Sequence, residues 1–214
     1  MGCYGMSKIV IFGAGGRGGK AAVAEARRRG HEVTAVVRSP AAHRDLAADG
    51  VTVVAGDVTD AGDVAKAAAG HDAAIASVAD LSVPPREFYT GAVRALGAGL
   101  ADAGVSRLVF VGLASLLVGG SGVQIVDEPG FPQEYREFVS GHAAGLDALA
   151  ETGLDWLYIS PAGDFDHDGG RSGSYQIAGH GDLELRMTYP DFAIALLDEI
   201  DNPAHSRTHL AVTA

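Results

Sequence analysis

Short apolar runs rich in β-branched residues alternate with alanine-rich segments along the chain. The first run, Lys8–Phe12, has the composition of a strand that is covered on both faces. Further runs of this kind follow, separated by helical segments: Glu32–Val37, Val51–Ala55, Ala73–Ala76, Arg107–Val111 and 155–159. Strands that alternate with helices pair in parallel through right-handed crossovers. The pattern therefore predicts an α/β fold built on a doubly wound parallel sheet.

Two helical segments carry clear start and stop signals. Segment 20–29 is followed by Gly30, which suits a left-handed cap. The arginines at 27–29 suit the negative end of the helix dipole, and we interpret them as a solvated helix end. Segment 84–103 starts with proline and is followed by Gly104, as expected for a helix.

The middle of the C-terminal half is less regular. Segment 133–151 is predicted to be helical, although Gly141 and Gly145 weaken it and allow a break. The glycine- and aspartate-rich stretch 162–182 is predicted to be loop, with a short strand at 174–178.

The chain ends in a predicted helix that starts at Tyr189 and runs towards Ile200, followed by an edge strand at 208–212. Neither repeats nor a long linker interrupt the sequence. We therefore expect one domain, 1–214, in which the part from about 160 to 214 forms the substrate side.

Composition and charge narrow the function. With 47% hydrophobic and 20% charged residues among 214, the chain can bury a sizeable core. A net charge of -11 disfavours nucleic acid or an anionic membrane as a partner. Cys3 is the only cysteine, and neither a leader segment nor an apolar run long enough to span a bilayer is apparent. We expect a cytoplasmic protein, monomeric or homodimeric, that binds small molecules.

A glycine-rich turn follows the first strand directly and opens the next helix: Gly13-Ala14-Gly15-Gly16-Arg17-Gly18-Gly19. Gly13 permits a sharp turn, Gly16 leaves room for a pyrophosphate, and Gly19 allows close packing of helix on strand. The free N–H groups of the helix N-terminus then face the phosphates. In this context the turn predicts a Rossmann-type dinucleotide site, and a turn without a ligand is the alternative.

Residues after the second strand indicate which dinucleotide is bound. Arg38 stands where an acidic residue would accept hydrogen bonds from the ribose of NAD, and an arginine there accommodates a 2′-phosphate. Arg17 supplies a second positive charge from the glycine turn. Together they favour NADP(H) over NAD(H), with two solvent-facing arginines as the alternative.

The next strand ends supply further cofactor contacts, because ligands of open α/β sheets bind beyond the carboxyl ends of the strands. Asp57 is predicted to accept from the adenine amino group and Val58 to pack on the ring. A helix cap formed by Asp57 and Thr59 is the alternative. Ser77, Val78 and Ala79 follow the fourth strand and are predicted to border the ribose and nicotinamide.

Several motifs recur together along nearly the whole chain: Gly13-x-x-Gly16-x-x-Gly19, Arg38-Ser39-Pro40, Gly56-Asp57-Val58, Leu154-Asp155-Trp156, Ser160-Pro161-Ala162, the run from Gly170 to Tyr175, and 191–199. With these motifs the chain resembles the atypical short-chain dehydrogenases of the NmrA-like, NAD(P)-binding group. Within that group it is similar to bacterial NADH-flavin reductases, and it is also similar to biliverdin reductase B. Gly15 is a departure, since Thr or Ser is usual there. The resemblance implies that the residues from Pro161 to Phe165, Pro161 and Ala162 first among them, contact the carboxamide side of the nicotinamide. It also implies that Ser115 lies near the catalytic serine of related enzymes.

Typical short-chain dehydrogenases use a Tyr-x-x-x-Lys pair as proton relay. The lysines here are Lys8, Lys20 and Lys66, and we predict that the relay is absent. Hydride transfer remains feasible, because the nicotinamide carries the hydride and a conjugated acceptor can take its proton from water.

Candidate catalytic side chains follow the fifth strand. Ser115 could hold a substrate carbonyl or simply satisfy its loop. Tyr135, Phe138 and His142 recur at helical spacing, and His142 is a candidate proton donor near neutral pH, with an aromatic face packed on the core as the alternative. The acidic stretch 164–168 is more typical of a solvated turn than of a metal site, so no metal is expected.

The leading hypothesis is an NADPH-dependent oxidoreductase that transfers hydride to a conjugated small molecule, flavin-, quinone- or enone-like. Two alternatives stay open. One is a non-catalytic NADP(H)-sensing regulator of the NmrA type, and the other is an isomerase or epimerase that uses the cofactor transiently.

Overall fold

The computed structural model describes residues 5–214, so Cys3 lies outside the described part. Its centre is an eight-stranded sheet in the order β3-β2-β1-β4-β5-β6-β10-β8. Every pairing from β3 to β10 is parallel, and β8 joins β10 in antiparallel fashion. The strands are β1 (Lys8–Phe12), β2 (Glu32–Val37), β3 (Val51–Ala55), β4 (Ala73–Ala76), β5 (Arg107–Val111), β6 (Asp155–Pro161), β8 (Gln176–Ile177) and β10 (Thr208–Thr213). This confirms the predicted α/β fold with a doubly wound parallel sheet.

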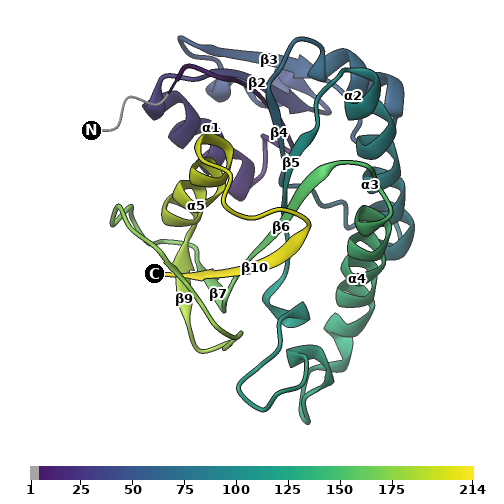
Figure 1. Ribbon diagram of the computed structural model, residues 1–214, viewed down its shortest axis with the longest axis vertical. Helices are drawn as coiled ribbons and strands as arrows, with labels where there is room; N and C mark the ends of the chain where they lie inside the picture. The colour runs from purple at the N-terminus through teal and green to yellow at the C-terminus, as the bar shows by residue number, and fades with distance from the viewer. Residues whose placement is uncertain (1–4) are drawn as a thin grey trace.

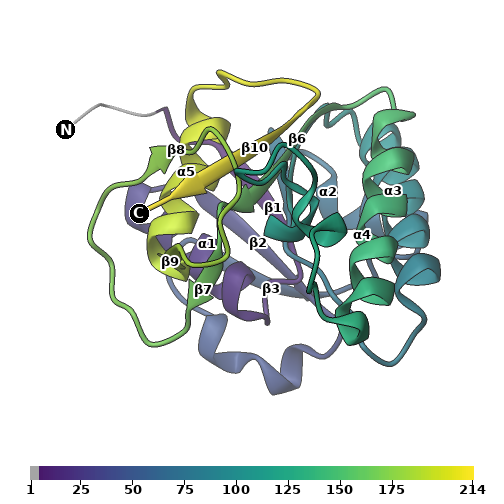
Figure 2. The ribbon, with the colours of Figure 1, turned by 90° about the horizontal axis from the view of Figure 1, so that it is seen from below.

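Helices cover both faces of the sheet (Figures 1 and 2). On one face lie α1 (Arg17–Arg29) and α5 (Tyr189–Asp201), and on the other lie α2 (Ala61–Ala68), α3 (Pro85–Asp102) and α4 (Arg136–Ala150). Because successive side chains of a strand point to opposite faces of the sheet, β1 contributes residues to two hydrophobic cores. Ile9 and Ile11 pack under α1 and α5, whereas Val10 and Phe12 pack under the other three helices. The near-continuous apolar runs seen in the sequence reflect this burial on both faces.

The predicted strands are confirmed, with β6 two residues longer than expected. Helix α1 starts at Arg17, inside the glycine turn, rather than at residue 20. Helix α4 starts at Arg136, after a 3₁₀ turn at Gln133–Tyr135. Among residues 5–214, no helix is long and apolar enough to cross a membrane.

The two glycines of α4 do not break it. They allow it to approach α3: a Cβ atom added at Gly141 would lie 2.5 Å from Cβ of Pro85, and one at Gly145 would lie 2.9 Å from Cβ of Tyr89. The glycines therefore serve helix packing, which outweighs their low helix propensity.

The C-terminal part adds structure that the sequence pattern did not predict. Strands β7 (Asp164–Asp166) and β9 (Arg186–Thr188) form a separate two-stranded parallel sheet. Strand β10 is not the edge strand that we predicted, because β8 pairs with its last two residues, Val212 and Thr213.

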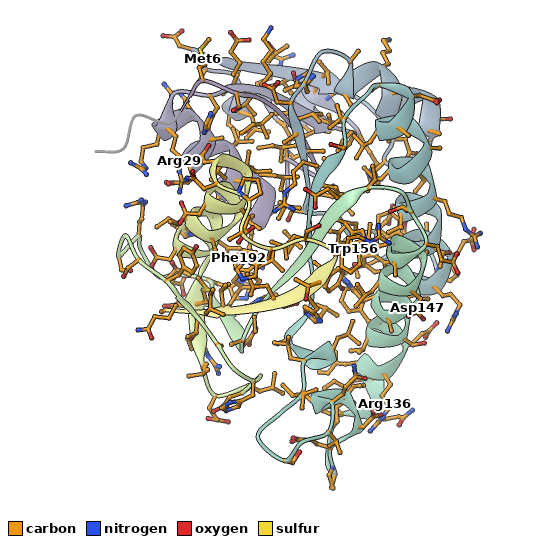
Figure 3. The ribbon with its side chains drawn as sticks, viewed as in Figure 1. Met6, Arg29, Arg136, Asp147, Trp156 and Phe192 are labelled. Carbon is orange, nitrogen blue, oxygen red and sulfur yellow. The ribbon has the colours of Figure 1, made fainter. Side chains whose placement is uncertain are left out.

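The arginines that end α1 are not all solvated. The side chain of Arg29 is 4% exposed and lies between α1 and α5 (Figure 3). It contacts Glu25 at 2.9 Å and both Asp198 and Asp201 at 2.8 Å. The interpretation of a solvated helix end is therefore wrong for Arg29, whose partners on α5 are remote in sequence.

Candidate functional site

A cleft of about 1030 Å³ opens at the carboxyl ends of the strands. It lies where the strand order reverses, between β1 and β4, which is the usual ligand site of open α/β sheets. Its lining comes from the segments that follow β1 to β5, from α3 and α4, and from Phe165 and Tyr189. Residues far apart in the chain thus meet in one cavity.

The glycine turn forms the floor of one half of this cleft. Gly13 has a φ of 74°, and a side chain there would collide with the carbonyl oxygen of Ser77. A side chain at Gly19 would collide with the carbonyl oxygen of Gly13, so only glycine allows α1 to pack this close to β1. Gly15, Gly16, Arg17 and Gly18 line the cleft together with Gly13.

The start of α1 fits an anionic ligand. Gly16 is the residue before the first turn and, in the described chain, supplies no side-chain cap; that first turn holds no acidic residue. Its backbone N–H groups and the positive end of the helix dipole are therefore available to a pyrophosphate.

The usual Thr or Ser at position 15 would require the imidazole of His43 to move. That ring fills the adjacent space, and a Cβ on Gly15 would lie 2.5 Å from Cε1 of His43. The departure at Gly15 is thus matched by the position of His43, which itself lines the cleft.

Arg38 forms an ion pair across the mouth of the cleft. Its Nη1 donates to Oδ2 of Asp80, which follows β4, so the pair spans the carboxyl end of β1. Ser82 holds the other oxygen of Asp80 through its backbone N–H at 2.9 Å and its hydroxyl at 2.6 Å. These bonds from Ser82, with the charge of Arg38, keep the pKa of Asp80 below its usual value.

Asp57 and Val58 line the same half of the cleft. Oδ1 of Asp57 accepts from the backbone N–H of Thr59 at 2.9 Å and from its hydroxyl at 2.7 Å, which closes a local turn. The cap of α2 is Asp60, which accepts from the N–H of Asp63. Asp57 therefore is not the helix cap, although part of its hydrogen-bonding capacity is used by Thr59.

The other half of the cleft is bordered by Ser77, Val78 and Ala79 and by an aromatic wall of Phe88, Tyr89, Phe138 and His142. Tyr89 stands edge-on to Phe138 at 5.8 Å between ring centroids and lies 3.7 Å from the ring of His142. This wall suits a flat conjugated ring better than a small polar substrate.

Five predicted residues lie elsewhere than in the cleft lining, and one of them is Gly19, which packs α1 on β1. Tyr135 is 58% exposed, Ser115 lies in the 3₁₀ turn Ala114–Leu116, and Pro161 and Ala162 are buried at the end of β6. Their predicted roles stay predictions.

Sequence reasoning missed Asp80, Tyr89 and Tyr189 as cleft residues. Asp80 directly follows Ala79, the last residue predicted to border the nicotinamide after the fourth strand, and could have been found by extending that segment. Phe165, which ends the segment predicted to contact the nicotinamide, does line the cleft, and its ring stacks at 4.1 Å on that of Tyr189, the first residue of α5.

A hydrogen bond to the sheet holds the side chain of His142 in place. Its Nδ1 lies 2.8 Å from the hydroxyl of Tyr158 on β6, and burial lowers the pKa of His142 to about 3. The imidazole is therefore neutral at pH 7, which disfavours the predicted proton transfer from an imidazolium.

The spacing Tyr-x-x-x-Lys does occur in the chain, from Tyr4 to Lys8. Tyr4 lies outside the described residues. Lys8 starts β1 at the end opposite the glycine turn, with Nζ 3.6 Å from Glu32. Lys8 is therefore too far from the cleft to act in a relay there.

Comparison with known proteins agrees with this geometry. The model of a family described as NAD(P)H-binding matches residues 13–203, which confirms the predicted resemblance to NAD(P)-binding proteins. An uncharacterized Bacillus subtilis protein, YwnB, is 35% identical over 218 residues, covering 97% of this chain and 98% of that protein.

Solved structures of similar chains cover the whole fold. A Streptococcus pneumoniae protein whose name proposes an NADH-flavin reductase is 30% identical with a TM-score of 0.80, over 97% of this chain and 99% of that one. A Bacteroides thetaiotaomicron protein whose name proposes an epimerase is 28% identical with a TM-score of 0.85, over 98% of this chain and 97% of that one.

Proposed function

The chain belongs to the NAD(P)H-binding family, and from this premise we propose that it is an NADPH-dependent oxidoreductase acting on a conjugated small molecule, such as a flavin, a quinone or an enone. One observation carries the proposal: a single cleft joins an uncapped helix N-terminus behind a glycine turn to an aromatic wall. The first feature suits a dinucleotide and the second a flat acceptor.

The cofactor would be held by backbone more than by side chains. The first turn of α1 would donate to the pyrophosphate, Asp57 and Val58 would border the adenine, and Ser77 to Ala79 would border the ribose and nicotinamide. When bound, the reduced dinucleotide supplies a hydride.

Arg38 supports NADPH as the preferred form. Its side chain is 70% exposed at the cleft mouth, where it would meet a 2′-phosphate. Asp80 already accepts a hydrogen bond from Arg38, so the phosphate competes with a carboxylate for the same guanidinium. Preference for NADPH then rests on the greater charge of a phosphate.

A conjugated acceptor suits a cleft that holds no Tyr-x-x-x-Lys relay among residues 5–214. Phe138 and His142 on α4 have the same spacing as the tyrosine and lysine of such a relay. Neither of their side chains is charged at pH 7. A simple ketone would need a positioned acid, whereas a reduced flavin or quinone takes its proton from water. The name of the Streptococcus pneumoniae relative supports the same acceptor class.

The proposal is tested by titrating the protein with NADPH and NADH, then adding FMN or menadione and following the absorbance of the reduced nicotinamide. We expect tighter binding of NADPH and oxidation that depends on the acceptor. Tight binding without oxidation would favour the sensor or, in line with the name of the Bacteroides relative, an isomerase. No binding of either dinucleotide would refute the reading of the glycine turn.

A further inference from the structure

We propose that His142 binds the acceptor as a neutral hydrogen-bond donor through its Nε2–H group, and that Tyr158 is a positioning residue that fixes this tautomer. The inference rests on the proposed function and adds to it a group that recognises the acceptor: a carbonyl oxygen or an unprotonated ring nitrogen conjugated with the reducible bond. Flavins and quinones both carry such atoms.

The position of His142 gives its two nitrogens different surroundings. The residue is 4% exposed and lines the cleft from α4. Its Nδ1 faces the sheet, 2.8 Å from the hydroxyl of Tyr158. Within residues 5–214 no hydrogen-bond partner is found for Nε2. Nε2 is therefore the nitrogen left for a ligand in the cleft.

Tyr158 determines which nitrogen carries the proton. The phenol is 1% exposed, and burial raises its pKa far above the usual value, so it keeps its hydrogen. A buried phenol hydrogen needs an acceptor, and among the described residues Nδ1 of His142 is the group within hydrogen-bond distance of this hydroxyl. In the proposed arrangement Nδ1 therefore accepts from Tyr158, and the proton of the neutral ring sits on Nε2.

The neighbouring rings hold the imidazole in this orientation. Tyr89 of α3 lies against one side at 3.7 Å between centroids, and Phe138 stands edge-on at 5.0 Å. The hydroxyl of Tyr89 is buried without a partner among the described residues and so does not compete for Nδ1.

This arrangement fits the charge changes of the proposed reaction. Hydride addition reduces the acceptor by two electrons, oxidises the nicotinamide and places negative charge on the acceptor's oxygen or nitrogen. Nε2–H would stabilise that charge by a hydrogen bond without giving up its proton, and water would supply the proton that completes the product. A neutral imidazole is suited to this role, because it donates without requiring acid conditions.

Nuclear magnetic resonance of protein with ¹⁵N-labelled histidine tests the tautomer without any turnover. The His142 signals, assigned by their loss in His142→Gln, should show the Nε2–H form alone. Tyr158→Phe should give a mixture of tautomers. Tyr89→Phe, which removes another buried hydroxyl of the same wall, should leave the tautomer unchanged. An Nδ1–H form in the wild type, or no effect of Tyr158→Phe, would overturn the proposal.

Kinetics with NADPH and menadione test the role in catalysis. We expect kcat to fall about tenfold in Tyr158→Phe and about a hundredfold in His142→Leu, with partial recovery in His142→Gln, whose amide can donate from a similar position. The Kd for NADPH should not change. Equal activity of His142→Leu and wild type would refute the role.

A binding experiment separates this inference from the proposed function. Menadione added with NADP⁺, which allows no reduction, should shift the Nε2–H signal of His142. A shift without turnover in the wild type would refute the reductase but retain the donor. Binding of menadione that leaves this signal in place would refute the donor alone, and no binding of menadione or FMN would overturn both.

Discussion

At the scale of single residues, the proposed preference for NADPH depends on one arginine with two possible partners. Arg38 pairs with Asp80 in the structure, and we propose that a 2′-phosphate takes the place of that carboxylate. The sequence predicted Arg38 from its place after the second strand, because that end of a strand is fixed by the fold. It did not predict the pairing, since Asp80 follows a different strand.

Arg38→Asp should weaken NADPH binding at least tenfold more than NADH binding, because a charge-assisted contact is worth about 1.5–3 kcal/mol and the variant adds repulsion. Fluorescence titration with both dinucleotides measures this. Arg44→Asp is a matched control, an exposed charge reversal outside the cleft, and should alter both affinities little. Equal losses for the two dinucleotides in Arg38→Asp would remove Arg38 from phosphate recognition.

Two histidines predict how stability depends on pH: His142, which is buried, and His209, which is half-buried. Burial lowers the pKa of His142 to about 3 and that of His209 to about 4. Below pH ~6.5 the unfolded chain binds protons that the folded chain does not, so stability decreases as the pH falls through this window. The slope for each histidine approaches about 1.4 kcal/mol per pH unit once the pH is well below ~6.5.

Urea unfolding measured from about pH 7 to about pH 5 checks this slope, and replacing both histidines by glutamine should remove most of it. Glu25 acts in a separate, more acidic range. Burial opposes its ionisation, but hydrogen bonds from Arg28, Arg29 and Arg171 lower the pKa of Glu25 to about 2. A stability that stays constant down to about pH 5 would contradict the neutral state of the histidines.

At the scale of elements, the contact between α3 and α4 shows where local reasoning fails. Propensity predicted that Gly141 weakens α4, yet the residue lies against Pro85 of α3 in an unbroken helix. The glycine turn was predictable because its strand, turn and helix are adjacent in sequence. The approach of α4 to α3 was not, because it depends on residues more than fifty positions away.

Gly141→Ala should therefore destabilise the protein by about 1–3 kcal/mol, because overpacking exceeds the gain of about 1 kcal/mol in helix propensity. Gly91→Ala in α3 is the matched control, because an added Cβ there meets nothing within 4 Å. The urea concentrations at which the two variants are half unfolded measure this difference in stability. A Gly141→Ala protein as stable as Gly91→Ala would mean that the helices separate without cost.

At the scale of the whole molecule, a buried network fastens the first helix to the last. Arg29 of α1 reaches Asp198 and Asp201 of α5, and Glu25 completes the cluster. The sequence showed the three arginines of α1 but not their partners, which lie more than 160 positions away. The side chains of Arg29, Glu25 and Asp201 are almost fully buried, so a charge left alone among them has little water to solvate it.

Arg29→Leu should reduce the free energy of unfolding by about 3–5 kcal/mol, because it leaves carboxylates buried without their partner. Arg27→Leu removes an exposed arginine two positions before Arg29 in the same turn of α1. The Nε of Arg27 donates to the carbonyl of Asp49 at 3.3 Å, and its loss should change stability little. Thermal and urea unfolding distinguish the two. Similar losses of unfolding free energy in both variants would show that the buried network stabilises the protein no more than an exposed ion pair does.

The order of the strands also governs how the chain is made. No two neighbouring strands between β3 and β10 form a hairpin, so each pair must close a long loop before its hydrogen bonds are gained. Such topologies fold slowly. Strand β6 gains its outer partner only with β10, which follows it in the chain after β7, β8, β9 and α5. Until β10 has been synthesised and has docked, the edge of β6 stays open to other strands, and an exposed edge of this kind favours aggregation.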